Sequence, residues 1–589
     1  LPTCSFVQRT QSTTSDQAKD EHLSRTTVFV ENEGWQGLST HFTAPGPGQW
    51  ELDRSHFPGG TTSIMKWLLS NAMESAYLKQ WALLGIPAET LSVSFVHGFM
   101  YTRLRPLVRP DKPSARPPPT FLLKIATRLH PEFRRRTAAA RRTLAESPAP
   151  PVIAEWHATL RPGMVAANLA FQEVVLEELD DADLAAHLEA VLAHLRNTFE
   201  EHFRLHCYDL GPIGQLLMAG NGWGIPSGDM LQALGGASPS TVEPLEALTR
   251  IRMAIAEAGV SPTSLAEVEA ASPAAAEELR SYLRLRSSVL FSGYDLDTPT
   301  LGEAPGVILA SILSAGGTTT THDSRGVATS LRERVPEDDH TRFDELLHAA
   351  RDAMDLRDDN GPITAEWPCG LLRLGMLETG ARLASTGRFH DPVHVFELDR
   401  GELPAVMGGA DQPGADELAE RATERSAQKN LNPPLTLGDP EAPPPLDALP
   451  KPLATTVALV QTVIAEMGMG GHAEEPTSAD EPRLSGNGVG TEAFIGVARV
   501  AENAEEAFDR LKPGEILVTR TTSPAYNMVL SLVGGLVTAD GGPMSHAAVL
   551  SRELGIPAVV GAPDAMRSIA DGDRIEIDPV RGVVRLVVT

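Results

Sequence analysis

The sequence predicts a multidomain protein in which a large, mainly α-helical domain precedes a smaller C-terminal α/β domain. The chain has 589 residues, more than a single hydrophobic core usually serves. Apolar residues recur at helical spacing between residues 166 and 206, whereas short β-branched runs bounded by Gly, Pro and Asp dominate after residue 490. Between these regions, Pro- and Gly-rich stretches interrupt the pattern, as is typical of linkers.

The N-terminal region carries several segments with helical periodicity. We expect a helix in TTSIMKWLLSNAMESAYLKQWALLG, followed by a short apolar stretch that ends near residue 104. A stripe of Leu and Phe side chains from Leu184 to Phe203 predicts a longer helix. Strand-like alternation is scarce before residue 480, so residues 36–430 are predicted to form one helical domain, preceded by a polar, poorly ordered segment at 1–35. Further helices are expected at 263–291, 341–357 and 370–386.

Residues 431–484 are predicted to form a Pro/Gly-rich linker with a single helix, LATTVALVQTVIAEM. Within and beyond it, residues 468–490 have almost no apolar content, which predicts a flexible tether. The final residues, 485–589, are predicted to form a compact α/β domain. Its expected strands are GVARV, ILVTR, GGLVTAD, IPAVVG, DRIEID and GVVRLVV, and its expected helix is SHAAVLSRELG.

Composition excludes several classes of partner. The 50 Lys and Arg residues against 77 Asp and Glu residues give a formal charge of −27, which disfavours nucleic acids and anionic membranes. An Arg-rich stretch within residues 101–150 is interpreted as a solvated face. The three cysteines build no disulfide framework, no run of about 18 apolar residues occurs, and the first 25 residues lack a signal peptide. A cytoplasmic protein is expected.

The sharpest local feature is a glycine loop between an expected strand and an expected helix. It contains Gly541, Gly542, Ser545 and His546, with Ser545 at the expected N-cap and His546 at the first helical position. Paired glycines let backbone N–H groups approach an anion, and the helix N-terminus adds a partial positive charge. Because a neutral imidazole is a competent nucleophile toward phosphorus, the loop predicts a phosphorylated histidine. The alternative is a histidine that only caps a helix.

Three C-terminal segments match a known family. They are PGEILVTRTTSPAY, GGLVTADGGPMSHAAVLSRELGIPAVVGAPDA and DGDRIEIDPVRGVVRL. Together they resemble the swivelling phosphohistidine domain of the phosphoenolpyruvate-utilising family. The resemblance implies a β/β/α fold for residues 485–589, movement of this domain between two sites, and phosphorylation of His546.

Four N-terminal segments more loosely resemble the helical acceptor-binding domain of rifampin phosphotransferases and phenylphosphate synthase alpha subunits. They are PGPGQWELDRSHFPGG, LRDD, LASTGRFHDPVHVFELDRGEL and LGDPEAPPPLDALP. The resemblance implies that residues 36–430 bind a small hydroxylated acceptor. The low aromatic content of 5% leaves the class of acceptor open, and apolar helices could shape a pocket for an aromatic or polyketide-like alcohol.

The family layout also carries expectations about the phosphoryl donor. Phosphoenolpyruvate synthases have a barrel after the histidine domain, whereas this sequence ends at Thr589, so phosphoenolpyruvate and pyruvate are not expected as substrates. Neither a Gly-rich Walker loop nor an ATP-grasp strand pattern is evident. ATP with Mg²⁺ is therefore expected on a separate ATP-grasp subunit or on a missing fused domain, with no cofactor or metal site in this chain.

Candidate acceptor-binding residues come from the loosely matching segments. Asp53, Arg54 and His56 lie in WELDRSHFP, where they serve either an acceptor or a turn. Arg357 and Asp358 fall where rifampin phosphotransferases have an Arg-Glu pair followed by a Lys. Here Asp replaces Glu and a glycine, Gly361, replaces the Lys, so the role of the pair stays open.

Three further histidines were weighed as ligand-binding groups. His97 lies in an apolar run and is expected in the core, within possible reach of a ligand. His202 and His206 have the i, i+4 spacing of metal ligands, but no third ligand is evident. A surface or core pair is favoured for them.

Three functions fit these features. The leading hypothesis is a dikinase-type phosphotransferase that passes a phosphoryl group from ATP through His546 to a hydroxyl of the acceptor. The second is a dehydratase or lyase in which the phosphoester is transient and phosphate is eliminated. The third is a non-catalytic phosphocarrier subunit whose helical region binds a protein.

Overall fold

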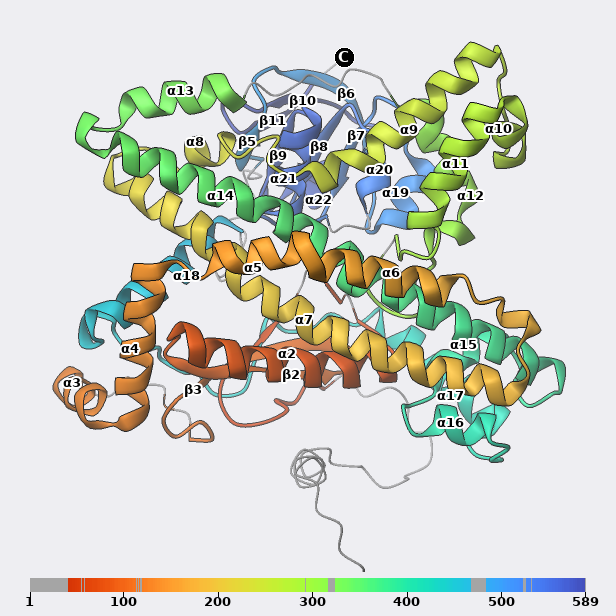
Figure 1. Ribbon diagram of the computed structural model, residues 1–589, viewed down its shortest axis with the longest axis horizontal. Helices are drawn as coiled ribbons and strands as arrows, with labels where there is room; N and C mark the ends of the chain where they lie inside the picture. The colour runs from red at the N-terminus through yellow and green to blue at the C-terminus, as the bar shows by residue number, and fades with distance from the viewer. Residues whose placement is uncertain are drawn as a thin grey trace, which may run out of the picture. The chain divides into compact units, whose positions relative to one another are not determined.

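The computed structural model describes residues 41–587 except 54–55, 58, 113, 115, 117–118, 292, 316–323, 468–483, 523–525 and 531 (Figure 1). The predicted helices of the N-terminal region are present, except that residues 263–291 hold two helices separated at Ser272, whose backbone is extended. The 42-residue helix α7 (Asp181–Gly222) is the longest of the described helices, and α2 (Ser63–Leu84), α14 (His340–Gly361) and α15 (Trp367–Ser385) pack against it. The predicted Leu and Phe stripe of α7 is buried in this contact, which confirms the periodicity argument.

Local sequence explains where these helices begin and end. Asp180 caps α7 by accepting a hydrogen bond from the backbone N–H of Asp183 at 2.8 Å, and Gly85 ends α2 with a φ of 80°. A π-helical turn, η5 (Pro362–Glu366), joins α14 to α15 without a break in helical backbone. Such turns place side chains off the regular helical stripe and are frequent at functional sites.

The remaining described α-helices of this region pack partly on this core and partly in separate apolar clusters, one of which α9 to α12 form. They are α3 (Thr120–Leu129), α4 (Pro131–Glu146), α5 (Ala149–Glu155), α6 (Arg161–Gln172), α8 (Ser227–Gln232), α9 (Pro239–Ala258), α10 (Leu265–Ala271), α11 (Pro273–Arg286), α12 (Pro305–Ser314), α13 (Ser324–Arg334), α16 (Glu402–Met407), α17 (Ala415–Gln428) and α18 (Lys451–Glu466). Among the described residues, no helix is both long and apolar enough to cross a bilayer.

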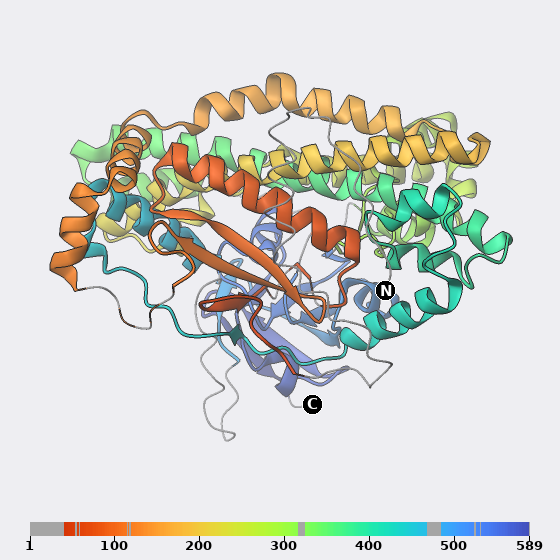
Figure 2. The same ribbon diagram turned by 90° about the horizontal axis from the view of Figure 1, so that it is seen from below.

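The helical region also contains a four-stranded antiparallel sheet, in the order β2-β3-β1-β4, beneath α2 (Figure 2). The expected scarcity of strands before residue 480 was wrong here. A tight turn at His97 and Gly98, with φ angles of 49° and 73°, joins β2 (Ala88–Val96) to β3 (Phe99–Pro106). Two consecutive positive φ angles are typical of a hairpin turn, and the short strand pattern is hard to distinguish from an apolar helix end.

The Pro-rich segment after residue 430 is attached to this sheet. Its residues Thr436–Leu437 form β4, which pairs with β1 (Trp50–Leu52). Arg103 of β3, only 4% exposed, donates to Glu441 at 2.7 and 2.9 Å. This ion pair fastens a segment that has little regular structure to the sheet.

The C-terminal region forms a seven-stranded sheet with the order β11-β10-β6-β7-β8-β9-β5, and every predicted strand is present. Strands β6 to β9 run parallel, and alternate side chains are buried on both faces. Helices α19 (Ala504–Arg510), α20 (Asn527–Leu530) and α21 (His546–Leu554) cover one face, and α22 (Ala565–Ser568) covers the other. The strands are β5 (Asn487–Val489), β6 (Phe494–Val500), β7 (Ile516–Thr519), β8 (Gly535–Thr538), β9 (Ala558–Val560), β10 (Arg574–Asp578) and β11 (Val583–Leu586).

Residues 468–483 lie outside the described part of the chain, so the structure bears on only the last residues of the tether predicted at 468–490. The prediction was wrong for its last residues, since Asn487–Val489 pair with β9. Backbone pairing needs no apolar side chain, and a Cβ on Gly488 would lie 1.7 Å from the carbonyl oxygen of Pro579. The polar and glycine-rich composition therefore gave no sign of this strand, in which position 488 has room only for glycine.

The Arg103–Glu441 pair generates a stability prediction. Glu441→Ala should lower the free energy of unfolding by about 2 kcal/mol, because the buried guanidinium loses its carboxylate. Denaturant titration followed by tryptophan fluorescence measures the effect. The control Glu278→Ala removes the exposed pair with Arg250 and should cost less than about 0.5 kcal/mol. Equal losses in both variants would contradict the role given to Glu441.

Candidate functional site

His546 begins helix α21 directly after the loop that follows β8. Ser545 is the N-cap, as predicted, and its side chain accepts a hydrogen bond from the backbone N–H of Ala548 at 3.4 Å. Gly541 has a φ of 114°, and a Cβ there would lie 2.9 Å from Oγ of Ser545. The loop therefore needs glycine at this position. Gly555 ends α21 with a φ of 66°, at the last residue of the expected helix SHAAVLSRELG.

The environment of His546 keeps its imidazole neutral. Its Nδ1 lies 2.9 Å from Oγ1 of Thr522, and the side chain is half-buried. Burial, and then the positive charge of Arg357, lower the pKa of His546 from 6.5 to about 3. At neutral pH the ring therefore holds an unprotonated nitrogen, the form required of a nucleophile.

Helix α14 brings Arg357 to the histidine loop across nearly 190 residues of sequence. Its Nη2 donates to the carbonyl oxygen of Met544 at 3.0 Å, and its buried Nη1 has no hydrogen-bond acceptor among the described residues. Asp358 follows, and its Oδ2 accepts from Oγ1 of Thr241 at 3.3 Å. Burial raises the pKa of Asp358. The structure thus places an incompletely paired cation beside His546, and the carboxylate that follows it in α14 lines the same cavity.

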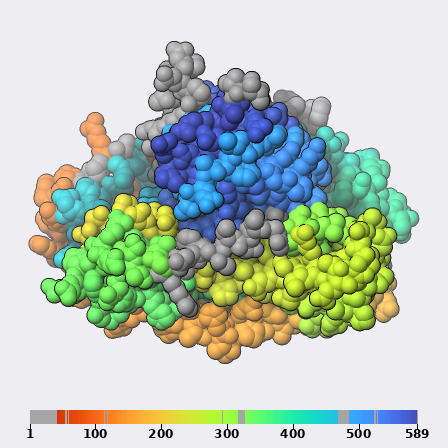
Figure 3. Space-filling view, turned by 90° about the horizontal axis from the view of Figure 1, so that it is seen from above, coloured from red at the N-terminus to blue at the C-terminus, as the bar shows by residue number. Residues whose placement is uncertain are grey.

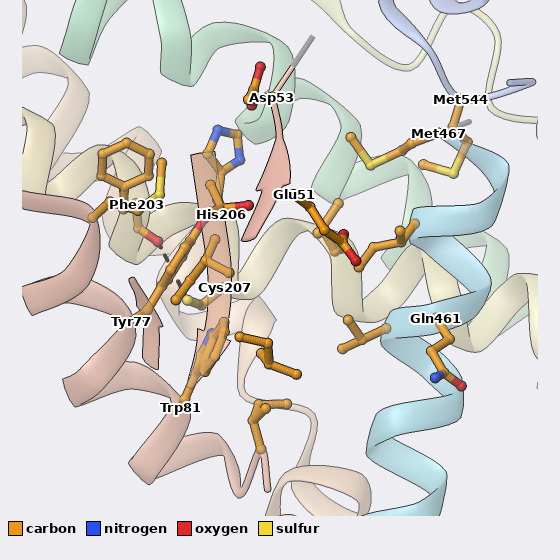
Figure 4. Close-up of a pocket in the computed structure, with 18 of the residues that line it drawn as sticks. Glu51, Asp53, Tyr77, Trp81, Phe203, His206, Cys207, Gln461, Met467 and Met544 are labelled. Atoms are coloured by element: carbon orange, nitrogen blue, oxygen red, sulfur yellow. Dashed lines mark hydrogen bonds between the residues drawn. The ribbon is translucent and has the colours of Figure 1, made fainter. Parts of the chain in front are cut away.

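His546, Arg357 and Asp358 line one cavity of about 2440 Å³, which both regions of the chain enclose. Most of its wall is apolar or aromatic. Figure 4 shows Tyr77 and Trp81 of α2, Phe203, His206 and Cys207 of α7, and Gln461 of α18 around it. Gly541 and Ser545 of the histidine loop also reach its wall.

Of the other predicted acceptor-binding residues, some line this cavity and others do not. Asp53 and His56 line the cavity and contact each other, with His56 Nδ1 3.0 Å from Asp53 Oδ2. Burial lowers the pKa of His56, but the charge and hydrogen bond of Asp53 outweigh it, so the pKa is raised. Arg54 lies outside the described residues. His97 is neither a core nor a cavity residue: it forms the β2–β3 turn and packs edge-on against Phe42.

The two histidines of α7 also differ from the expected surface or core pair, because both line the cavity. His202 Nδ1 lies 2.9 Å from Oγ1 of Thr364, and His206 Nδ1 lies 2.7 Å from Oδ2 of the fully buried Asp209. Their ring centroids are 4.5 Å apart. Across the described residues, no group of three or more His, Cys, Asp or Glu side chains is arranged to hold a metal ion.

Sequence reasoning missed three residues of the cavity wall, Thr522, Tyr294 and Glu366. Glu366 is only 5% exposed, and burial raises its pKa to about 8. A lone acid in the apolar stretch GPITAEWPCG was the available signal. Thr522 lies in the family-matching segment PGEILVTRTTSPAY, which marks the segment but not this residue, and the sequence around Tyr294 has no distinctive pattern.

The C-terminal domain is docked on the helical region so that His546 faces the cavity. Met544 and Val549 pack into an apolar cluster with residues of α7, α8 and α14. Glu553 of α21 accepts hydrogen bonds from the backbone N–H of Gly236 at 2.8 and 3.0 Å. In Figure 3 this domain, in blue, is seated among the yellow and green helices. These contacts hold the histidine at the cavity rather than in solvent.

The electrostatics of His546 can be tested by NMR titration of its ring. Arg357→Gln should raise its pKa from near 3, because a nearby positive charge no longer opposes the imidazolium, yet leave it below 6.5, because burial remains. Arg334→Gln, which changes an exposed Arg paired with Asp229, should have no effect on His546. An ordinary histidine pKa in the unmodified protein would contradict the account.

Comparison with known proteins places the C-terminal domain. Residues 511–582 match the PEP-utilising enzyme, mobile domain. A pyruvate kinase of Lactobacillus delbrueckii subsp. bulgaricus is 44% identical over 99 residues, 17% of this chain and 17% of that protein. A probable phosphoenolpyruvate synthase of Pyrococcus abyssi is 39% identical over 113 residues, 19% of this chain and 14% of that protein.

A longer match is to chondramide synthase of Chondromyces crocatus, 32% identical over 253 residues, 42% of this chain and 6% of that protein. The chain thus spans between 6% and 17% of the length of these three curated relatives. Residues 511–582, which include His546, thus form a C-terminal mobile (phosphohistidine) domain of the PEP-utilising enzyme type.

Proposed function

We propose that this protein is a phosphotransferase in which His546 receives a phosphoryl group from ATP and passes it to a hydroxyl of an organic acceptor. One observation carries the proposal: His546 and Arg357 lie together on the wall of a large, mainly apolar cavity. A cavity of about 2440 Å³ also far exceeds the needs of pyruvate, which favours a larger acceptor. A phosphocarrier without a substrate would not need such a cavity.

The residues suggest how transfer to the acceptor proceeds. The acceptor oxygen attacks phosphorus, a P–O bond forms, and the N–P bond to His546 breaks, so that the ring leaves as a neutral imidazole. The guanidinium of Arg357 balances negative charge on the phosphoryl oxygens. Asp358, whose pKa is raised by burial, accepts the hydroxyl proton.

On the donor side, we assign ATP and Mg²⁺ to an ATP-grasp unit, present as a partner subunit or a fused domain. The family resemblance supports this assignment. Among the described residues, no three or more His, Cys, Asp or Glu side chains are grouped as ligands for a metal ion. The C-terminal domain then undocks from the cavity to reach that unit, a swivelling movement of the kind that lets one group serve two sites.

Phosphorylation of His546 is the direct test of the proposal. The protein is incubated with cell extract, Mg²⁺ and ATP labelled at either the β or the γ phosphate, and acid-labile label is mapped by peptide sequencing. We expect label on His546 and none after His546→Gln. The control His348→Gln changes an exposed histidine, 80% accessible, and should label normally. Label retained by His546→Gln would overturn the assignment.

Arg357 should matter for transfer rather than for folding. Arg357→Gln should slow loss of label from phosphorylated His546 to an acceptor about 100-fold, because one charged donor to the phosphoryl oxygens is lost. Arg357→Lys should recover part of the rate by restoring the charge. Quench-flow measurement in the presence of cell metabolites gives the rates, and equal rates in all three proteins would refute the role of Arg357.

Product analysis separates phosphorylation from elimination. A stable phosphoester is expected when labelled protein is discharged on acceptor. An alkene with free phosphate would instead favour the dehydratase or lyase.

A further inference from the structure

The cavity contains a second cluster of polar side chains away from the histidine loop. We call the group of Glu366, Tyr294, His202 and His206, with the His56–Asp53 pair, the polar centre. The rings of His56 and Tyr294 are 5.4 Å apart, and those of His202 and His206 are 4.5 Å apart. Tyr294 also lies within electrostatic reach of Glu366 and Asp53, and His202 within that of His56. All line the cavity, and Figure 4 shows His206 and Asp53 near one another on its wall.

One buried group in the polar centre lacks a partner. Oε1 of Glu366 is buried and makes no hydrogen bond within the described residues. A Cβ on Gly361 would lie 3.3 Å from this oxygen, so the absence of a side chain at Gly361 leaves space beside it. An unpaired buried polar atom costs free energy unless something satisfies it. Because both residues line the cavity, a bound molecule can supply that partner.

The side chains of the polar centre offer hydrogen-bond donors and acceptors but no unpaired positive charge. The pKa of Glu366 is raised by burial to about 8 and that of Tyr294 is raised above its ordinary 10, so both are neutral donors near pH 7. His206 donates from Nδ1 to the carboxylate of Asp209, so its Nε2 is an acceptor when the ring is neutral.

The cations that face this cluster are already paired. Arg286 is the cation whose charge acts on Glu366, and its Nη2 lies 2.9 Å from Oε2 of Glu243. His56 is paired with Asp53. An anionic ligand would therefore meet Asp53 and the buried Asp209 without a cation to balance it. An uncharged group that both donates and accepts hydrogen bonds fits better.

We propose that the polar centre binds an uncharged hydrogen-bonding group of the acceptor, such as an alcohol, phenol or amide, at the end opposite the phosphorylated hydroxyl. The assignment of the occupant as the acceptor rests on the proposed function. Arg357 and Glu366 lie on one continuous helical path, nine residues apart, which corresponds to roughly 13 Å at the usual helical rise. The acceptor is therefore an elongated molecule with polar groups at both ends.

The test measures binding of three matched probes by equilibrium dialysis at pH 7: 2-naphthol, which donates and accepts; 2-methoxynaphthalene, which only accepts; and anionic 2-naphthoate. We expect 2-naphthol to bind about tenfold more tightly than either of the others, the effect of one well-placed hydrogen bond in a buried site. Equal binding of all three, or tighter binding of 2-naphthoate, would overturn the proposal.

Variants locate the binding. Glu366→Leu and Tyr294→Phe should each remove most of the preference for 2-naphthol, whereas Glu366→Gln, which still donates, should retain it. The control Gln461→Leu removes a polar side chain from another part of the cavity wall and should leave the preference intact. If Glu366→Leu does not fold, Tyr294→Phe is the deciding variant, because it deletes a single oxygen atom and so disturbs the fold least. An unchanged preference in Tyr294→Phe would refute the site.

His546→Ala keeps this test separate from that of the proposed function. The variant should bind the probes as the unmodified protein does while losing all phosphorylation. Probe binding without phosphorylation of His546 would leave the polar centre standing and refute the phosphotransferase. Phosphorylation of His546 without selective binding of the probes would support the phosphotransferase and refute the polar centre.

Discussion

The hydrogen bond from Arg357 to the carbonyl oxygen of Met544 is the contact on which the site depends. It joins α14 of the helical region to the loop that precedes His546, and it brings a guanidinium to a buried imidazole. Burial is the main reason that the His546 ring is neutral, and the cation at this contact lowers its pKa further, because a positive charge disfavours the protonated ring. The remaining donor atom of Arg357 is left for an anionic group.

The second constraint is the size and character of the cavity. Apolar and aromatic side chains from many elements, α2 and α7 among them, make most of its wall, and the polar side chains form small groups within it. Water is a poor competitor in such a setting, and a phosphoryl group on a histidine survives longer when water is excluded. The docked domain closes part of the wall with its own side chains, which couples the presence of the histidine to the shape of the acceptor site.

A single helical path organises both ends of this cavity. Arg357 and Asp358 lie in the last turns of α14, and Glu366 ends the π-helical turn that follows. A regular α-helix would continue the same stripe of side chains, whereas the extra residue per turn rotates the side chains that follow. The proposed phosphoryl site and the proposed polar centre are thus set by one stretch of backbone, and a shift of α14 would move both.

The histidine loop was predictable because its determinants are local. Gly541, the cap at Ser545 and the helix start at His546 follow from a few adjacent residues, as do the periodic helices and the β-branched strands. The strands at 88–106 were missed, because a short apolar run does not distinguish strand from helix and because their turn includes a histidine. The strand at Asn487–Val489 was missed because glycine and polar residues pair through backbone alone.

The sequence by itself determined the local structure of the loop that leads to His546 and the order of the helical and α/β regions. Only the tertiary structure decided which distant residues share the cavity. In it, Arg357 contacts the loop that carries His546, and His97 lies in a β-turn. Glu366 and the two histidines of α7 line the cavity. The physical reason is that a loop is specified by local backbone preferences, whereas a cavity is the space left where helices far apart in sequence fail to fill each other's grooves.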